Sequence, residues 1–120
     1  MNVIIHHNPR CSKSRTTLAL LREHGIEPEI VRYLDDPPDP ARLRQIAARL
    51  GVGPAEMVRT GESTWKELGL ALDALDDESL LRILSEHPIL IERPIVELGE
   101  RARIGRPPEA VLDILQQRRR

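Results

Sequence analysis

The sequence has no phenylalanine and only one cysteine, one tryptophan and one tyrosine among its 120 residues. A single cysteine excludes an internal disulfide and a structural zinc site built from several thiolates. Because aromatic residues are so few, the core must consist of Leu, Ile, Val and Ala, as in helices packed on a small sheet. A lone free thiol fits a reducing compartment, so we expect a cytoplasmic protein.

The chain also lacks a long apolar run and an excess of one charge. No stretch reaches the roughly 18 apolar residues that span a membrane, and Met1-Asn2 leads into a short strand, not a signal peptide. Charged residues make up 31% of the chain, yet the net charge is -1. We therefore expect no nucleic-acid partner, because phosphate contacts need a cationic excess on one face. The closing arginines, residues 118–120, are interpreted as a solvated end.

The first 33 residues read as strand, helix, strand. Apolar β-branched residues predict strands at Val3–Ile5 and Glu29–Tyr33, and Asn8-Pro9 places a turn at His6–Arg10. A helix is predicted over Ser12–His24, with Leu18, Ala19 and Leu21 as its apolar stripe. This order calls for a right-handed crossover and a parallel pair of strands.

The middle of the chain has a helical pattern and no strand pattern. Asp39 and Pro40 start a helix that runs over Ala41–Leu50, and shorter helical pieces are predicted at Pro54–Val58, Thr64–Leu68 and Glu78–Glu86. We interpret residues of about 40–88 as a helical insert. Beyond it, Ile95–Leu98 and Ala102–Ile104 predict a hairpin, and Pro107 starts a last helix with Val111, Leu112 and Leu115 as its apolar face.

These elements predict an α/β, thioredoxin-like fold. Its mixed sheet would have about four strands, a parallel pair plus an antiparallel hairpin, flanked by helices and interrupted by the insert. No linker divides the sequence, so we expect one domain over residues 1–120. No strongly apolar exposed stripe stands out, so a monomer is expected.

Cys11 stands between the first strand and the predicted helix. Free backbone N–H groups and the positive end of a helix dipole meet there, and both favour a thiolate over a thiol. Arg10, Lys13 and Arg15 add nearby positive charge. The N–H groups of Ser12, Lys13 and Ser14 can also hold an oxyanion of the arsenate or phosphate type. A nucleophile and an anion site would then coincide, although a free cysteine can also be an inert apolar filler.

Several neighbours admit two interpretations each. His7 either orients or protonates the thiol or only hydrogen-bonds the loop. Ser14 stands where a Cys-x-x-Cys motif has its second cysteine, so an external thiol must complete any turnover. Its hydroxyl either caps the helix or hydrogen-bonds the Cys11 sulfur. No pair of histidines has metal-ligand spacing, so no metal site is expected.

Three arginines downstream suit a bidentate hold on a tetrahedral oxyanion: Arg59, Arg93 and Arg106. Arg93 precedes Pro94, and Arg106 lies between Gly105 and Pro107-Pro108. Each arginine alone is a weak signal, because most arginines are solvated surface residues.

Taken together, the motifs of the chain resemble those of the glutaredoxin-dependent arsenate reductases. The resemblance covers residues from about 3 to 115 in order, and it is carried by His7–Arg15, Tyr33-Leu34, Pro37-Pro38, Met57–Arg59, Glu67–Leu70, His87–Val96 and Gly105–Val111. Between Cys11 and Ser14 the chain has Ser-Lys where the plasmid-borne enzymes have Gly-Thr, which makes it more similar to the chromosomal members.

The resemblance implies an enzyme that reduces arsenate to arsenite. Cys11 would be the nucleophile, Arg59, Arg93 and Arg106 would hold the oxyanion, and His7 would lie beside the thiol. Pro94 would follow a cis peptide bond. Glutathione would be a co-substrate and glutaredoxin the partner that regenerates the thiol, with no bound cofactor. Two alternatives remain open at this point: a glutathione-linked oxidoreductase with another substrate, and an Spx-like regulator that binds RNA polymerase.

Overall fold

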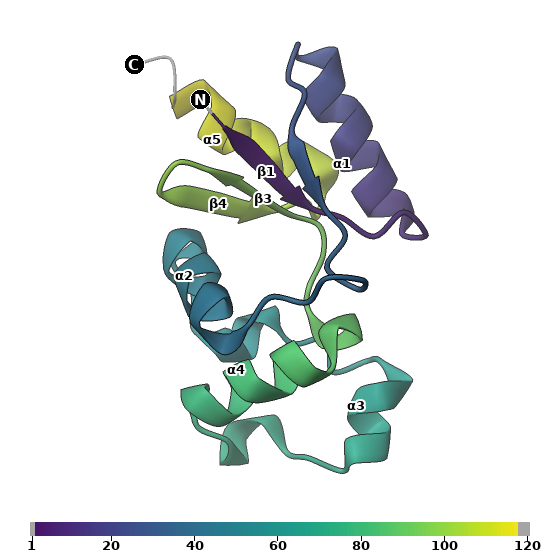
Figure 1. Ribbon diagram of the computed structural model, residues 1–120, viewed down its shortest axis with the longest axis vertical. Helices are drawn as coiled ribbons and strands as arrows, with labels where there is room; N and C mark the ends of the chain where they lie inside the picture. Colours follow the sequence, from purple (N-terminus) through teal and green to yellow (C-terminus); the bar gives the residue numbers. More distant parts are fainter. Residues whose placement is uncertain (1, 118–120) are drawn as a thin grey trace. The chain divides into compact units, whose positions relative to one another are not determined.

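The computed structural model describes residues 2–117, so the predicted solvated end at 118–120 lies outside the described residues. The chain divides into two compact units, one formed by the residues up to Asp36 together with those from Arg93 onward, and the other by Pro37–Glu92 (Figure 1). That the chain acts as one domain stays a prediction. No helix within residues 2–117 is long and apolar enough to cross a membrane.

The first unit contains a four-stranded sheet in the order β2-β1-β3-β4. Its strands are β1 (Val3–His6), β2 (Glu29–Val31), β3 (Ile95–Leu98) and β4 (Arg101–Ile104). β1 and β2 are parallel, whereas β3 is antiparallel to both β1 and β4, so that Ile5 lies between Ile30 and Val96. The parallel pair and the antiparallel hairpin confirm the predicted thioredoxin-like sheet.

Helices α1 (Ser12–Glu23) and α5 (Leu112–Gln117) cover one face of this sheet. The residues buried together there come from both helices, the turn before α5 and the strands: Val3, Ile5, Leu21, Val96, Leu98, Val111, Ile114 and Leu115. The predicted apolar stripe of α1 was partly wrong. Its buried residues are Ser14, Thr17 and Leu21, whereas Leu18 is half-buried and Ala19 is exposed. Ser14 and Thr17 can be buried because both hydroxyls have hydrogen-bond partners.

Several element ends differ from the predictions. His6 belongs to β1 and not to the following turn. β2 stops at Val31, because the carbonyl of Arg32 accepts hydrogen bonds from the N–H groups of Asp35 and Asp36 and closes a turn. The last helix begins as a 3-10 turn, η4 (Pro108–Val111), in which the Ala110 N–H bonds the Pro107 carbonyl before α5 continues.

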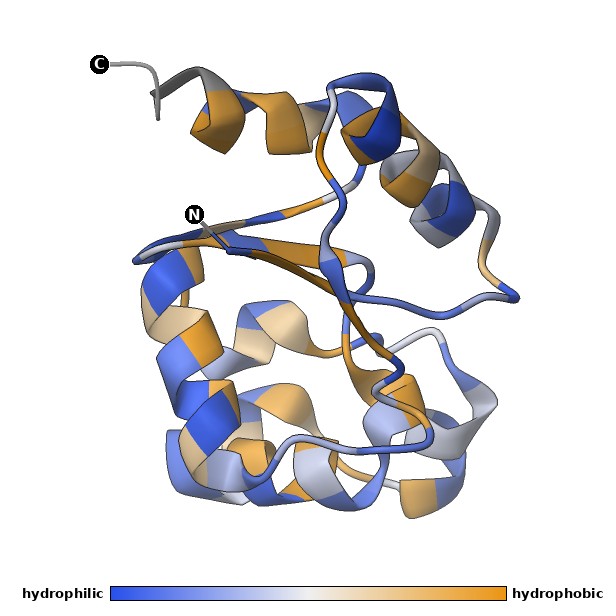
Figure 2. Ribbon diagram, turned by 45° about the horizontal axis from the view of Figure 1, so that its top comes forward, coloured by the Kyte–Doolittle hydropathy of each residue, from blue (hydrophilic) through white to orange (hydrophobic). Residues whose placement is uncertain are grey.

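The second unit, described over its whole length of Pro37–Glu92, contains helices and no strand. They are α2 (Pro40–Leu50), η1 (Pro54–Met57), α3 (Ser63–Leu68), η2 (Leu72–Ala74), α4 (Asp77–Glu86) and η3 (Pro88–Leu90). The Asp39 carboxylate accepts the Arg42 N–H at 2.8 Å, as expected of the predicted cap. α2 packs on α4, and Figure 2 shows both helices with alternating hydrophobic and hydrophilic patches, typical of amphipathic helices.

Candidate active site

Cys11 lies at the end of the loop that joins β1 to α1. It is the N-cap of α1, with φ -91° and ψ 122°. Its N–H bonds the Asn8 carbonyl at 3.0 Å, and its carbonyl accepts the Arg15 N–H at 3.0 Å. The Asn8 side chain accepts the Arg10 N–H at 3.0 Å, which closes the loop. These bonds place the thiol at the positive end of a 12-residue helix.

The half-buried Cys11 sulfur accepts hydrogen bonds from backbone and guanidinium donors. Burial by itself raises the pKa of the Cys11 thiol. Hydrogen bonds from the Ser14 N–H, the Arg93 side chain and the Lys13 N–H outweigh that effect, and the charge of Arg93 adds to them. The pKa of Cys11 therefore lies below its ordinary value. This shift is toward the thiolate, the direction that the sequence predicted.

The source of the positive charge differs from the prediction. The cation that lowers the pKa of Cys11 is Arg93, far along the chain, and not the predicted neighbours Arg10, Lys13 and Arg15. Lys13 contributes its backbone N–H, and the Arg15 guanidinium donates to the Pro9 carbonyl at 3.0 Å. Ser12 is exposed at the first helical position. The side chains of residues 12–15 are exposed or already hydrogen bonded. The positive charge that acts on Cys11 therefore comes from Arg93, which lies just before β3.

Arg106 completes the basic side of the site. Its Nη2 lies 3.8 Å from the Cys11 sulfur, and its Nε donates to the Arg93 carbonyl at 2.7 Å. The peptide bond between Arg93 and Pro94 is cis, which confirms the prediction, and the bond between Arg106 and Pro107 is cis as well. Two arginines that are 13 positions apart are thereby connected to each other and to the thiol.

His7 and Ser14 form a buried pair behind the loop. His7 Nδ1 and Ser14 Oγ are hydrogen bonded at 2.6 Å, and the same hydroxyl accepts the Asn8 N–H at 3.1 Å. Neither interpretation of the Ser14 hydroxyl was therefore right, since it bonds His7 and the loop while only the Ser14 backbone N–H bonds the sulfur. His7 is thus bonded to the first turn of α1 through Ser14, and its action on the thiol stays a prediction.

The pKa of the His7 imidazole lies below its ordinary value. Burial lowers its pKa most, and the charges of Arg32, Arg22 and Arg15 lower it further. A lowered pKa favours the neutral form of the ring, which has one N–H donor and one acceptor nitrogen. His7 therefore supports the geometry of the loop, and the cations of the site are Arg93 and Arg106.

Arg59 belongs to the second unit, where two carboxylates hold it. Its Nε lies 3.1 Å from Glu62 Oε1, and its Nη1 lies 2.8 Å from Glu92 Oε1. Burial lowers the pKa of Arg59, but these two carboxylates outweigh that effect and raise it. The guanidinium is fixed and permanently charged, and its role in the oxyanion site stays a prediction.

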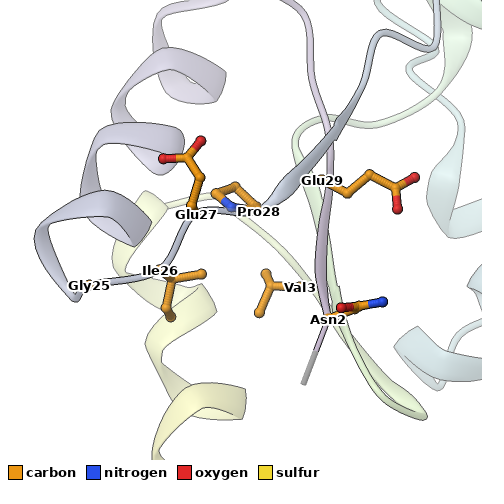
Figure 3. Close-up of a pocket in the computed structure, with 7 residues that line it drawn as sticks. All are labelled: Asn2, Val3, Gly25, Ile26, Glu27, Pro28 and Glu29. Atoms are coloured by element: carbon orange, nitrogen blue, oxygen red, sulfur yellow. The ribbon is translucent and has the colours of Figure 1, made fainter.

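A separate pocket of the first unit does not suit an oxyanion. Figure 3 shows it where α1 leads into β2, with Gly25, Pro28 and the carboxylates of Glu27 and Glu29 around it. The ionisable side chains that line it are acidic, so they repel an anion. Within residues 2–117, no group of three or more His, Cys, Asp or Glu side chains could hold a metal ion.

Thr17 and the contact role of Gly105 were not predicted from the sequence. Thr17 is fully buried and donates its hydroxyl to the Lys13 carbonyl at 2.7 Å. Gly105 donates its N–H to the Pro94 carbonyl at 2.8 Å. The available signals were a glycine directly before Arg106 and a threonine one turn after Lys13. Neither residue type by itself indicates a close contact near the thiol.

Replacing Arg93 by alanine is expected to raise the pKa of Cys11. The change removes a hydrogen bond and a positive charge that both favour the thiolate. Thiolate absorbance near 240 nm, or the alkylation rate of Cys11, measured as a function of pH should show the titration at higher pH. Arg103→Ala is the matched control, because Arg103 pairs with Asp113 at 2.9 Å on β4. Equal titration of Arg93→Ala and wild type would contradict the assignment.

Comparison with known proteins assigns the chain to a family. The profile of the ArsC family matches residues 6–114. An uncharacterized protein of Escherichia coli is 53% identical over 114 residues, covering 94% of this chain and 96% of that protein. The arsenate reductase of Haemophilus influenzae is 50% identical over 116 residues, covering 96% of this chain and 100% of that protein.

A solved structure agrees with these matches. The chain aligns with the arsenate reductase from Vibrio cholerae with a TM-score of 0.91 and 48% identity, covering 95% of this chain and 98% of the other. The family match spans both units and includes the loop of Cys11 and the segments of Arg93 and Arg106. The chain therefore belongs to the ArsC family.

Proposed function

We propose that this protein reduces arsenate to arsenite, with glutathione and glutaredoxin as the sources of electrons. The observation that carries the proposal is the Cys11 sulfur, which has its pKa lowered and lies 3.8 Å from Arg106 Nη2. Relatives about half identical over nearly the whole chain, from Haemophilus influenzae and Neisseria meningitidis, are named arsenate reductases.

The first step uses the thiolate as a nucleophile. The Cys11 sulfur attacks the arsenic of arsenate, an S–As bond forms, and one arsenate oxygen leaves as water after taking up protons. Arsenic remains As(V) in this step. The guanidinium groups of Arg93 and Arg106 offset the charge of the oxyanion while the anionic sulfur approaches it.

The electrons must come from outside, because the chain has a single cysteine. A glutathione thiol replaces a second arsenate oxygen, which also leaves as water. A glutaredoxin thiolate then attacks the glutathione sulfur and forms a mixed disulfide, and the electron pair of the broken S–As bond reduces arsenic to As(III). Water finally releases arsenite and restores the Cys11 thiol, so that two thiols are oxidised for each arsenate reduced.

The surroundings of Cys11 would supply two separate effects. The lowered pKa of Cys11 increases the fraction of nucleophile at neutral pH. The arginines lower the electrostatic repulsion between the Cys11 thiolate and the arsenate anion, which would otherwise oppose the attack. Arg59 would contribute only if arsenate competed with the Glu62 and Glu92 carboxylates for its guanidinium group.

Arsenate-dependent oxidation of NADPH tests the proposal. Wild-type protein is combined with arsenate, glutathione, glutaredoxin and glutathione reductase, and arsenite is quantified directly. We expect one arsenite for each NADPH oxidised, and no turnover when arsenate, glutathione or glutaredoxin is omitted.

Other outcomes would redirect the assignment. Glutathione-dependent reduction of a different substrate, without arsenite formation, would favour a thiol oxidoreductase that shares the site. No turnover combined with capture of RNA polymerase subunits would favour a regulator. Either result would overturn arsenate reduction while leaving the lowered pKa of Cys11 to be measured separately.

A further inference from the structure

Gly105 occupies a place in the first unit that has no room for a side chain. A Cβ atom added there would lie 2.6 Å from Thr17 Oγ1 and 2.8 Å from Pro94 Cγ. Real Cβ atoms essentially never approach other atoms this closely, so a side chain would force neighbours apart. The other six glycines of the chain have open space at the corresponding position.

One neighbour of Gly105 belongs to the segment that carries the arginines. Gly105 donates its N–H to the Pro94 carbonyl at 2.8 Å, and Pro94 directly follows Arg93. Arg106 directly follows Gly105, and its Nε donates to the Arg93 carbonyl at 2.7 Å. Arg93 and Arg106 are therefore the chain neighbours of the two residues, Pro94 and Gly105, that make this close contact.

The other neighbour belongs to the helix that carries the thiolate. Thr17 Oγ1, which lies where a Cβ of residue 105 would clash, donates to the Lys13 carbonyl at 2.7 Å. The N–H groups of Lys13 and Ser14 in this first turn bond the Cys11 sulfur. A displacement of Thr17 would therefore move the turn that holds the thiolate.

We infer that Gly105 is a positioning residue, whose missing side chain sets the distance between the Arg93 and Arg106 segment and the first turn of α1. Gly105 itself touches neither the thiol nor the substrate. The part of this inference that concerns turnover rests on the proposed function, whereas the part that concerns the Cys11 thiolate does not.

Gly105→Ala is expected to weaken the thiolate site and to slow turnover. Separation of the two segments lengthens the bonds from Arg93 and Arg106, so Cys11 should titrate at higher pH than in wild type. A misplacement of about 1 Å near a reacting group costs roughly a hundredfold in rate, and we expect kcat/KM for arsenate to fall by about 10- to 100-fold. Gly53→Ala is the matched control, because Gly53 is exposed and has open space around it.

A second substitution separates positioning from general damage. Thr17→Ala removes two of the three atoms nearest to the added Cβ, including Thr17 Oγ1 at 2.6 Å, and only the Pro94 contact remains. We therefore expect Gly105→Ala/Thr17→Ala to titrate at a pH between wild type and Gly105→Ala. Thr17→Ala alone should stay close to wild type.

The outcomes decide the inference without arsenate chemistry. A folded Gly105→Ala variant that titrates like wild type would overturn it, as would a raised pKa that Thr17→Ala does not relieve. If Gly105→Ala fails to fold by circular dichroism, the double variant is compared with Thr17→Ala, and equal titration of those two would also overturn it. If the wild-type protein showed no arsenate turnover, only the proposed function would be overturned. The titration of Cys11 in the Gly105 variants would still test the positioning role of Gly105.

Discussion

Replacing Cys11 by serine is expected to lower arsenate-dependent turnover by more than about a thousandfold, since loss of a covalent nucleophile removes the reaction path itself. A serine hydroxyl at this helix end would remain protonated at neutral pH, whereas the thiol has its pKa lowered by Ser14, Arg93 and Lys13. The chain has no other thiol that could substitute for it.

The same variant should keep the anion site. The backbone N–H groups and the Arg93 and Arg106 side chains remain, so arsenate binding measured by calorimetry should change far less than turnover. Thr16→Ser is the matched control, because Thr16 is exposed on the same helix. Substantial arsenite formation by the folded Cys11→Ser variant would contradict the covalent step, and loss of arsenate binding would place the sulfur itself in the anion site.

The fold could be predicted from local patterns because its elements are short and regularly delimited. Pro, Gly and Asp mark most of the helix ends, as Asp39 and Gly51 do for α2. The patterns of apolar β-branched residues were enough to predict four strands, and the order strand, helix, strand predicted the parallel pair. The ends of elements were less predictable, because the end of β2 depends on a turn at Arg32 that no residue type specifies.

The candidate site was predictable to a different degree for each kind of contact. The position of Cys11 follows from the order of the elements, because it stands between a predicted strand and the first residue of a predicted helix. Its partners Arg93 and Arg106 were proposed as weak signals, and they gained weight from the glycine and prolines beside them and then from the family resemblance. The hydrogen bond between His7 and Ser14 could not be predicted, because both interpretations of Ser14 were local to its own helix and His7 lies across the loop.

Breaking the buried pair of His6 and Glu97 is expected to cause a large loss of stability. His6 Nε2 lies 2.6 Å from Glu97 Oε2, and the two residues are 5% and 1% exposed. They connect the end of β1, which leads into the Cys11 loop, with β3, which follows Pro94. Removing one partner leaves a buried polar group without its acceptor, and such losses cost about 3 kcal/mol of unfolding free energy.

Glu97→Leu therefore should lower the free energy of unfolding by about 3 kcal/mol in a urea titration followed by circular dichroism. Glu100→Leu, in the exposed turn between β3 and β4, should change it by less than about 0.5 kcal/mol. His6→Leu/Glu97→Leu removes the unbonded imidazole as well, and it should be more stable than Glu97→Leu alone. If the double variant were instead the less stable of the two, the His6 ring would be stabilising β1 through packing, and the pair would contribute little through its hydrogen bond.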